Sequence, residues 1–249
     1  MRAQLRAEML KQRSTRTGLG LLAAMLGLVL LAVLLHALAL PAADLGSTER
    51  QLMVFGRGDF LAALFAALLG ALSITSEFRH GTIRPTLLVS PRRARVFAAK
   101  VWVSMLIGAG FGLAGSALAA GVGTAALRAR GIPIQLGGDD YALLLAGGVA
   151  AAALWAAIGV GLGAVLRHQV PTLIGISAWL LFVEGLLVGD AAGAVAKVGR
   201  FFPGAAATAI TGQGRGILIA PVVGLVLLAI YTAAAALAGS FATVRRDVV

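Results

Sequence analysis

The sequence predicts an all-α, polytopic membrane protein with six transmembrane helices and both termini in the cytoplasm. Of its 249 residues, 59% are hydrophobic and 12% are charged, and the mean hydropathy is +0.95. A soluble domain of this length needs a larger polar fraction, so lipid must surround most of the chain. The formal net charge is +11, but the basic residues lie at the ends of the apolar stretches. This placement is typical of membrane topology and argues against a nucleic-acid-binding protein.

Six apolar stretches are candidate spans, because a helix needs about 20 apolar residues to cross the hydrocarbon core. The second stretch is barely long enough, but without it every basic residue from Arg50 to Lys100 would lie outside, against the positive-inside rule. With it, fourteen basic residues lie inside and seven outside, where Asp59 belongs to the first outer loop. The predicted spans are residues 18–40, 60–76, 101–126, 141–166, 171–188 and 217–241.

The first 17 residues form a basic leader that we expect to be helical. Its amphipathicity is poor, so it fits either an interface helix at the lipid headgroups or a solvated leader that sets orientation. Ala37-Leu38-Ala39 resembles a signal-peptide cleavage site. However, the apolar stretch that it would end has 23 residues, longer than the roughly 7–15 of a signal-peptide core. We therefore expect it to be kept as the first span of a protein of a bacterial-type inner (plasma) membrane.

Two features inside the predicted spans concern packing and polarity. Small residues spaced four apart predict close helix contacts, since lipid provides no hydrophobic drive between helices. Ionisable residues in a bilayer need a partner or water, and the two candidates are Glu184 and His36. Glu184 fits either a substrate or partner role or an exposed position near the outer face, and His36 fits an interfacial position. The small residues are Ala62, Ala66, Gly70, Gly108, Gly112, Gly159 and Gly163.

The most unusual segment is the predicted cytoplasmic loop, residues 77–100. Gly81 is placed to end the second span in a left-handed conformation, and Thr82 is placed to cap a new helix whose first turn tolerates Pro85. Ser90 and Pro91 repeat this pattern before the third span. The segment therefore predicts a stiff, basic hairpin, although an ordinary positively charged loop that fixes topology is the alternative.

The residues from Ser76 to Arg93 also carry a family resemblance. The pattern Ser76-Glu77-Phe78-Arg79-x-Gly81-Thr82-Ile83-Arg84, followed by Thr86-Leu87-Leu88-x-Ser90-Pro91-Arg92-Arg93, resembles the segment after the second span in permease subunits of type-2 ABC exporters. The basic leader, the six spans, residues 201–205 (Phe-Phe-Pro-Gly-Ala) and the Arg245-Arg246-Asp247 terminus are also similar to that family.

The resemblance implies a function and a set of partners. The hairpin would dock on a separate ATP-binding cassette subunit, which would hold ATP and magnesium, and two permease chains would pair as a homo- or heterodimer. The leader would be an interface helix, and the outer loop, residues 189–216, would contain short helices that dip partway into the membrane, with a surface loop as the alternative. The residues expected to couple to the ATPase subunit are Glu77, Phe78, Arg79, Gly81, Thr82, Arg84, Pro91, Arg92 and Arg93.

The chain is expected to hold no catalytic, cofactor or metal site of its own. No G-x-x-x-x-G-K-[ST] sequence is present, there is no cysteine, and the three histidines lie in separate regions. An ion-gradient-driven secondary transporter or channel is the alternative function. Such a protein predicts paired intramembrane charges and repeated halves, whereas the sequence offers mainly Glu184 and no clear repeat.

Overall fold

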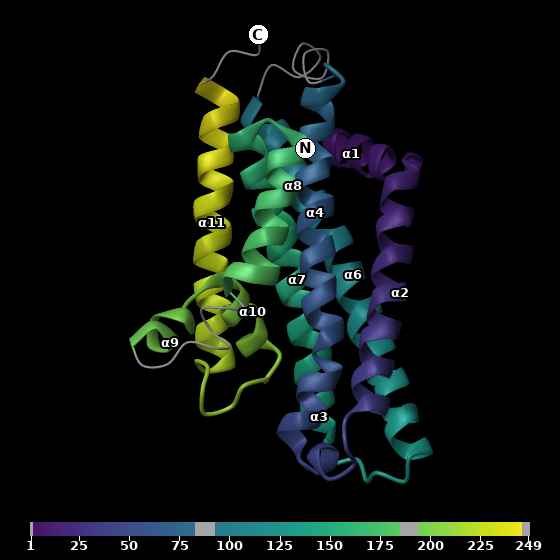
Figure 1. Ribbon diagram of the computed structural model, residues 1–249. Coiled ribbons are helices and arrows are strands. Elements are labelled where there is room, and N and C mark those ends of the chain that lie inside the picture. Colours follow the sequence, from purple (N-terminus) through teal and green to yellow (C-terminus); the bar gives the residue numbers. More distant parts are fainter. Residues whose placement is uncertain (1, 83–92, 185–193, 246–249) are drawn as a thin grey trace.

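The computed structural model describes residues 2–82, 93–184 and 194–245, and these residues contain helices and no β-strand (Figure 1). The predicted all-α class is therefore confirmed. A 3₁₀ turn, η1 (Asp44–Gly46), precedes α3, and a π-helical turn, η2 (Trp179–Val183), follows α8. The helices in chain order are α1 (Arg2–Ser14), α2 (Arg16–Ala39), α3 (Thr48–Phe55), α4 (Arg57–Arg79), α6 (Arg93–Ala129), α7 (Gly138–Leu166), α8 (Gln169–Ala178), α9 (Ala194–Gly199), α10 (Pro203–Ile210) and α11 (Pro221–Arg245).

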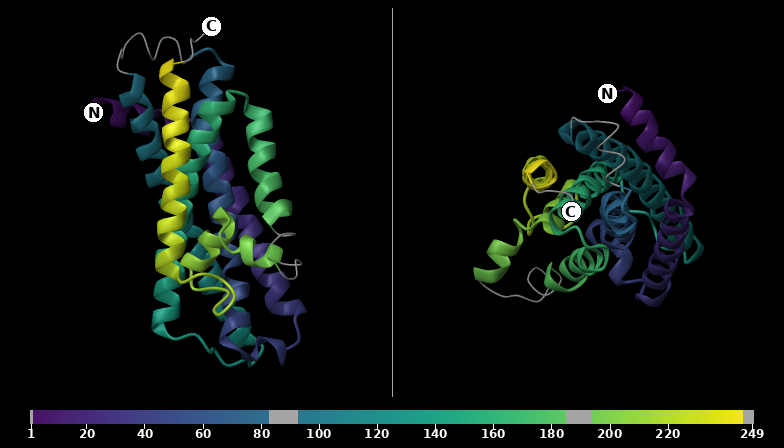
Figure 2. Two further views of the ribbon diagram at one scale, coloured as in Figure 1. Left: turned by 90° about the vertical axis from the view of Figure 1, so that its left-hand side faces the viewer. Right: turned by 90° about the horizontal axis from the view of Figure 1, so that it is seen from above.

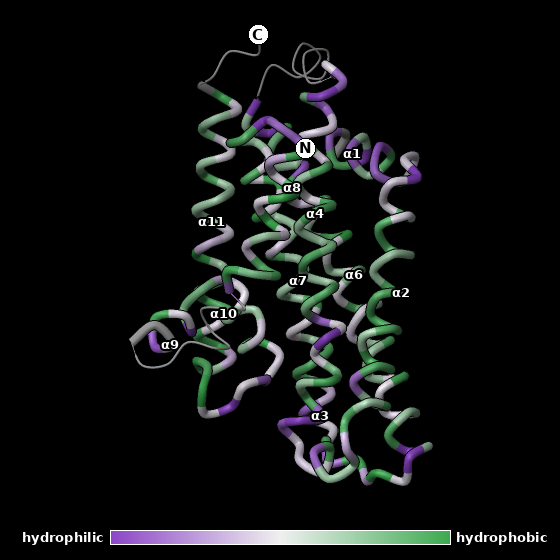
Figure 3. Tube along the Cα trace, in the orientation of Figure 1, coloured by the Kyte–Doolittle hydropathy of each residue, from purple (hydrophilic) through white to green (hydrophobic). Residues whose placement is uncertain are grey.

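Within the described residues, five helical stretches are long and apolar enough to cross a membrane. They are α2, the nearly continuous α3 and α4, α6, α7 and α11. These stretches run alongside one another, and many of the hydrophilic residues gather towards the two ends of the bundle (Figure 3). We call these ends the α1 end and the α3 end after the short helix found at each (Figure 1).

Helix α4 lies at the centre of the bundle and packs mainly against α7 and α6. Two glycines allow α4 and α7 to touch through their backbones. A β carbon on Gly70 would lie 2.0 Å from the carbonyl oxygen of Ala156, and one on Gly159 would lie 2.0 Å from that of Ala67. The predicted role of small residues in close packing is therefore confirmed at this contact.

The start of the predicted second span needs correction. α4 begins at Arg57 rather than residue 60, and α3 extends the helical stretch back to Thr48. As a result Asp59 is buried inside the bundle, contrary to the prediction that it belongs to an outer loop. Helix α6 begins at Arg93, shortly after Ser90 and Pro91, in agreement with the helix start predicted there before the third span.

The fifth predicted span, residues 171–188, is described only in part. α8 and η2 together have fifteen residues, fewer than the other candidate spans, and residues 185–188 lie outside the described part of the chain. Figure 2 shows that α8 starts near the α1 end and stops well short of the α3 end. Helix α10 lies between that point and the α3 end, where it packs on α11 and α7 and buries all four of its alanines. Six complete spans therefore stay a prediction.

The leader is helical, as predicted, because it forms α1. Figures 1 and 2 show that α1 lies across the end of the bundle, at a steep angle to α2, instead of continuing it. The break falls at Thr15, which has an extended backbone between the two helices. α1 packs against α6 and α2, so the leader is part of the folded chain.

Candidate functional site

Four charged residues from three helices form a cluster at the α1 end of the bundle. At its centre is Lys100 of α6, whose side chain is only 1% exposed. Its Nζ donates to Glu77 of α4 at 2.7 Å and to Glu8 of α1 at 2.8 Å, and also to the carbonyl oxygen of Ser73 at 3.3 Å. A buried ammonium must be paired in this way, because an isolated charge in an apolar interior is very costly.

Lys11 of α1 completes the cluster from its exposed side. Its Nζ lies 2.9 Å from Glu77 and 3.3 Å from Glu8, so two lysines balance two glutamates. Partial burial alone lowers the pKa of Lys11, but the hydrogen bond and negative charge of Glu77, together with those of Glu8, leave that pKa above its ordinary value. We call Glu8, Lys11, Glu77 and Lys100 the charge cluster.

The charge cluster follows from local helix geometry. Glu8 and Lys11 are three residues apart and therefore share one face of α1. Ser73 and Glu77 are four residues apart on α4, which allows Lys100 to contact both. Since α4 and α6 flank residues 83–92 on either side, the cluster ties α1 to both ends of the predicted coupling segment.

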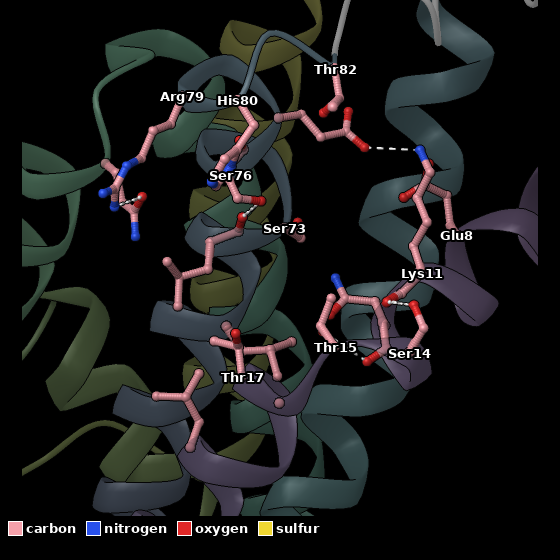
Figure 4. Close-up of a pocket in the computed structure, with 17 residues that line it drawn as sticks. Glu8, Lys11, Ser14, Thr15, Thr17, Ser73, Ser76, Arg79, His80 and Thr82 are labelled. Carbon is pink, nitrogen blue, oxygen red and sulfur yellow. Dashed lines mark hydrogen bonds and ion pairs between the residues drawn. The ribbon is translucent and has the colours of Figure 1, made fainter.

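A cavity of about 650 Å³ lies beside the charge cluster. Figure 4 shows Glu8, Lys11 and Ser14 of α1 on one side of it, and Ser76, Arg79 and His80 of α4 on the other. Three leucines, Leu21, Leu69 and Leu72, also contribute to its lining. The cavity therefore combines polar groups with apolar side chains from the neighbouring spans.

The structure separates the predicted coupling residues into buried and exposed groups. Glu77 belongs to the charge cluster and is only 7% exposed, so a partner subunit cannot contact it freely. Phe78 is half-buried under the guanidinium of Arg167, whose central carbon lies 5.3 Å from the ring centre. Arg79 is exposed and donates to Gln169 at 3.2 Å.

The remaining coupling residues lie at or beyond the end of α4. Gly81 has a φ of +68°, which confirms the predicted left-handed conformation, and both Gly81 and Thr82 are exposed. Arg93 is the first residue of α6 and donates to the carbonyl oxygen of Val244 at 3.4 Å. Arg84, Pro91 and Arg92 lie outside the described residues.

Glu184 acts as a cap for α10. Its carboxylate accepts from the main-chain N–H groups of Gly204 and Ala205, both at 2.9 Å, and from Nε1 of Trp179 at 2.5 Å. These amides belong to the first turn of α10, where orphaned N–H groups and the helix dipole both favour a carboxylate. The contacts explain the buried position of Glu184 without a substrate. His36, the other candidate, bonds through Nδ1 to the Ala32 carbonyl of its own helix.

Sequence reasoning missed Glu8, Lys100 and Asp59 as site residues. Glu8 is the only acidic residue of the leader, and Lys100 is one of three lysines in the chain. This rarity sets both residues apart but does not identify a partner for either, and the charge count treats Lys100 only as a marker of topology. The signal for Asp59 was the apolar stretch Leu52 to Phe55 just before it, which extends the helix beyond the second predicted span.

No protein-family model matches the chain, and no curated protein sequence shows significant similarity to it. The class must therefore come from the fold. The part of the chain that the structure describes contains five helical stretches that are long and apolar enough to span a bilayer, arranged in one bundle. They define a multi-pass α-helical membrane protein.

Proposed function

We propose that the chain is the membrane-spanning permease subunit of an ATP-driven ABC exporter. In this proposal it forms the translocation pathway in a bacterial-type inner membrane and pairs with a second permease chain. A separate ATP-binding cassette subunit binds ATP and magnesium and docks at the α1 end. The proposal starts from the resemblance of residues 76–93 to permease subunits of that type.

The observation that best supports the proposal is the charge cluster. A coupling element must transmit the movement of a docked ATPase subunit to the spans. The cluster joins α1, which lies across the end of the bundle, to the two helices that flank residues 83–92. Paired charges with little exposure hold these elements together, so a push on any one of them would reach α4 and α6 at once.

The exposed residues next to the cluster provide the expected contact with the ATPase subunit. Arg79 is exposed and points away from the charge cluster, and Figure 4 shows it at the rim of the cavity. Gly81 and Thr82 follow it in an exposed turn. Because Glu77 is buried, a substitution there would disturb the fold as well as any docking. Arg79 is therefore the sharper position for a test.

We predict that Arg79→Glu reduces co-purification of a P-loop ATPase with the full chain by about tenfold, since reversing a contact charge costs an interface at least about 1.4 kcal/mol. The matched control is Arg128→Glu, an exposed arginine near the opposite end of α6. Both variants would be purified gently from the native host, and their partners identified by mass spectrometry. Equal recovery of the ATPase with both variants, or no ATPase with the unmodified chain, contradicts the proposal.

An ion-gradient-driven transporter is the second candidate function, and one observation favours it. Asp59 is 4% exposed and lies within a helical stretch long and apolar enough to cross the membrane. A buried acid of this kind is a common element of ion-coupled transport. Transport that stops with an uncoupler while ATP is kept high would favour this candidate, and transport that follows ATP alone would exclude it.

A further inference from the structure

Asp59 sits in a niche between three helices, deep within the bundle. Its Oδ1 contacts the hydroxyl of Ser116 on α6 at 2.5 Å. On α7, a β carbon at Gly148 would lie 2.4 Å from Asp59 Oδ1 and 2.2 Å from Ser116 Oγ, so only glycine leaves room for the carboxyl group. Gly148 is ten residues into α7, which places it about 15 Å from the start of that helix at 1.5 Å per residue.

The hydrogen bonds around Ser116 accommodate Asp59 both with and without a proton. Ser116 Oγ lies 2.8 Å from the carbonyl oxygen of Gly112 and 2.5 Å from Asp59 Oδ1. A hydroxyl group has one hydrogen, and a carbonyl oxygen can only accept. An ionised Asp59 accepts the Ser116 hydrogen. When Ser116 donates instead to Gly112, the contact with Asp59 is a hydrogen bond only if Asp59 carries a proton and donates it to Ser116.

The other carboxyl oxygen, Asp59 Oδ2, is buried and has no hydrogen-bond partner in the described structure. Asp59 lines a cavity of about 290 Å³ between α4, α7 and α10. Trp155 lines it too, and its Nε1 is likewise unpaired. Unpaired buried polar atoms beside a cavity are typical of sites that hold water. The lining also includes Met53, which is 42% exposed, so the cavity reaches the surface near α3.

Few charged groups surround the cavity. Among the residues that the structure describes, Arg57 is the one other charged residue that lines it. The residues of α6 and α7 that touch Asp59, Ser116 and Gly148, are not titratable. From α10, Gly204, Ala207 and Thr208 contribute to the lining, and none of them is titratable either. Glu184 lies behind Gly204, where α10 amides satisfy its carboxylate. Within the described residues, therefore, no second carboxylate lines the cavity beside Asp59.

We propose that Asp59 is a proton-binding site within the membrane-spanning part of the chain, reached by water through the cavity from the α3 end. The site binds one proton on the carboxyl group, where it is held between Asp59 and Ser116, and returns it to water in the cavity. This inference does not depend on the ATPase partner, so its failure would leave the exporter proposal untouched.

The first test is infrared spectroscopy of the purified full chain in lipid. A protonated carboxyl absorption should persist well above pH 4, where exposed aspartates with a pKa of about 3.9 are ionised. Asp59→Asn should remove this absorption and Ser116→Ala should shift it. Glu184→Gln, which alters a buried carboxylate already satisfied by three donors, should leave it in place. The proposal is overturned if no protonated carboxyl absorption depends on Asp59. It is also overturned if Glu184→Gln removes the absorption as Asp59→Asn does.

The second test uses the absence of cysteine from the chain. Thr208→Cys places a thiol in the cavity, and Thr232→Cys places one in the buried part of α11. Both threonines bond to the carbonyl oxygen four residues earlier, so the changes are matched. In membranes exposed to reagent on both sides, a polar thiol reagent should label Thr208→Cys at least ten times faster. Equal rates overturn the proposed water route.

Discussion

Replacing Lys100 with methionine is expected to destabilise the folded chain by about 3–5 kcal/mol, the usual cost of removing one partner of a buried ion pair. Methionine keeps much of the apolar length of lysine but removes its charge. Glu8 and Glu77 would then face each other with only Lys11 between them, and Lys11 is 46% exposed. The measurement is the midpoint of denaturation of the purified chain in mixed micelles, together with the yield of folded protein.

The matched control is Lys11→Met, which removes a lysine from the same two glutamates. Because Lys11 is half-exposed, water would partly replace it, and we expect a loss of about 0–1 kcal/mol. Adding Glu77→Gln to Lys100→Met should recover part of the stability, since it removes one uncompensated charge. Equal losses for the two lysine variants would show that burial does not set the strength of the charge cluster.

The same lysine variants also test whether the charge cluster connects α1 to the spans. If the charge cluster holds α1 against α4 and α6, loss of Lys100 should free α1 before the spans separate. Proteolysis near Thr15, at the junction of α1 and α2, would then increase at denaturant levels that leave the bundle intact. The rate of cleavage near Thr15 is compared between Lys100→Met and Lys11→Met. Equal rates would indicate that α1 is held by its other contacts with α6 and α2.

The parts of the fold predicted correctly depend on local sequence. Long apolar stretches predict α2, α7 and α11 closely, because the length of a span follows directly from the thickness of the hydrocarbon core. Gly81 was predicted to be left-handed because little except glycine adopts that conformation readily at the end of a helix, and its φ of +68° agrees. In both cases the physical constraint lies within a few residues of the position concerned.

The parts that were missed depend on contacts between distant residues. Lys100 and Glu8 are 92 positions apart, and nothing in either neighbourhood reveals the pairing. A charge count assigns each ionisable residue to one side of the membrane, so it cannot place Asp59 inside a bundle where Ser116 and Gly148 make room for it. The contact of Glu184 with the first turn of α10 likewise joins residues twenty or more positions apart.

The contact between α4 and α7 gives the second large expected effect. Substitution of Gly159 by alanine should destabilise the chain by about 1–3 kcal/mol, as is usual for overpacking. The added methyl group would lie 2.0 Å from the carbonyl oxygen of Ala67 and 3.0 Å from the amide nitrogen of Ala71. These are backbone atoms of a helix, so they cannot rotate away, and α4 and α7 would have to move apart.

Whether Gly159→Ala lowers or raises the stability distinguishes an effect of packing from an effect of helix propensity. Alanine is a better helix former than glycine by up to about 1 kcal/mol, so a glycine without neighbours should be neutral or gain stability on the same change. Gly110 of α6 is such a control, because an added β carbon there meets nothing within 4 Å. Gly159→Ala should therefore lower the denaturation midpoint while Gly110→Ala leaves it unchanged or raises it. If both changes raise the midpoint, α4 and α7 do not touch through their backbones in the membrane, and the central contact of the bundle would have to be reassigned.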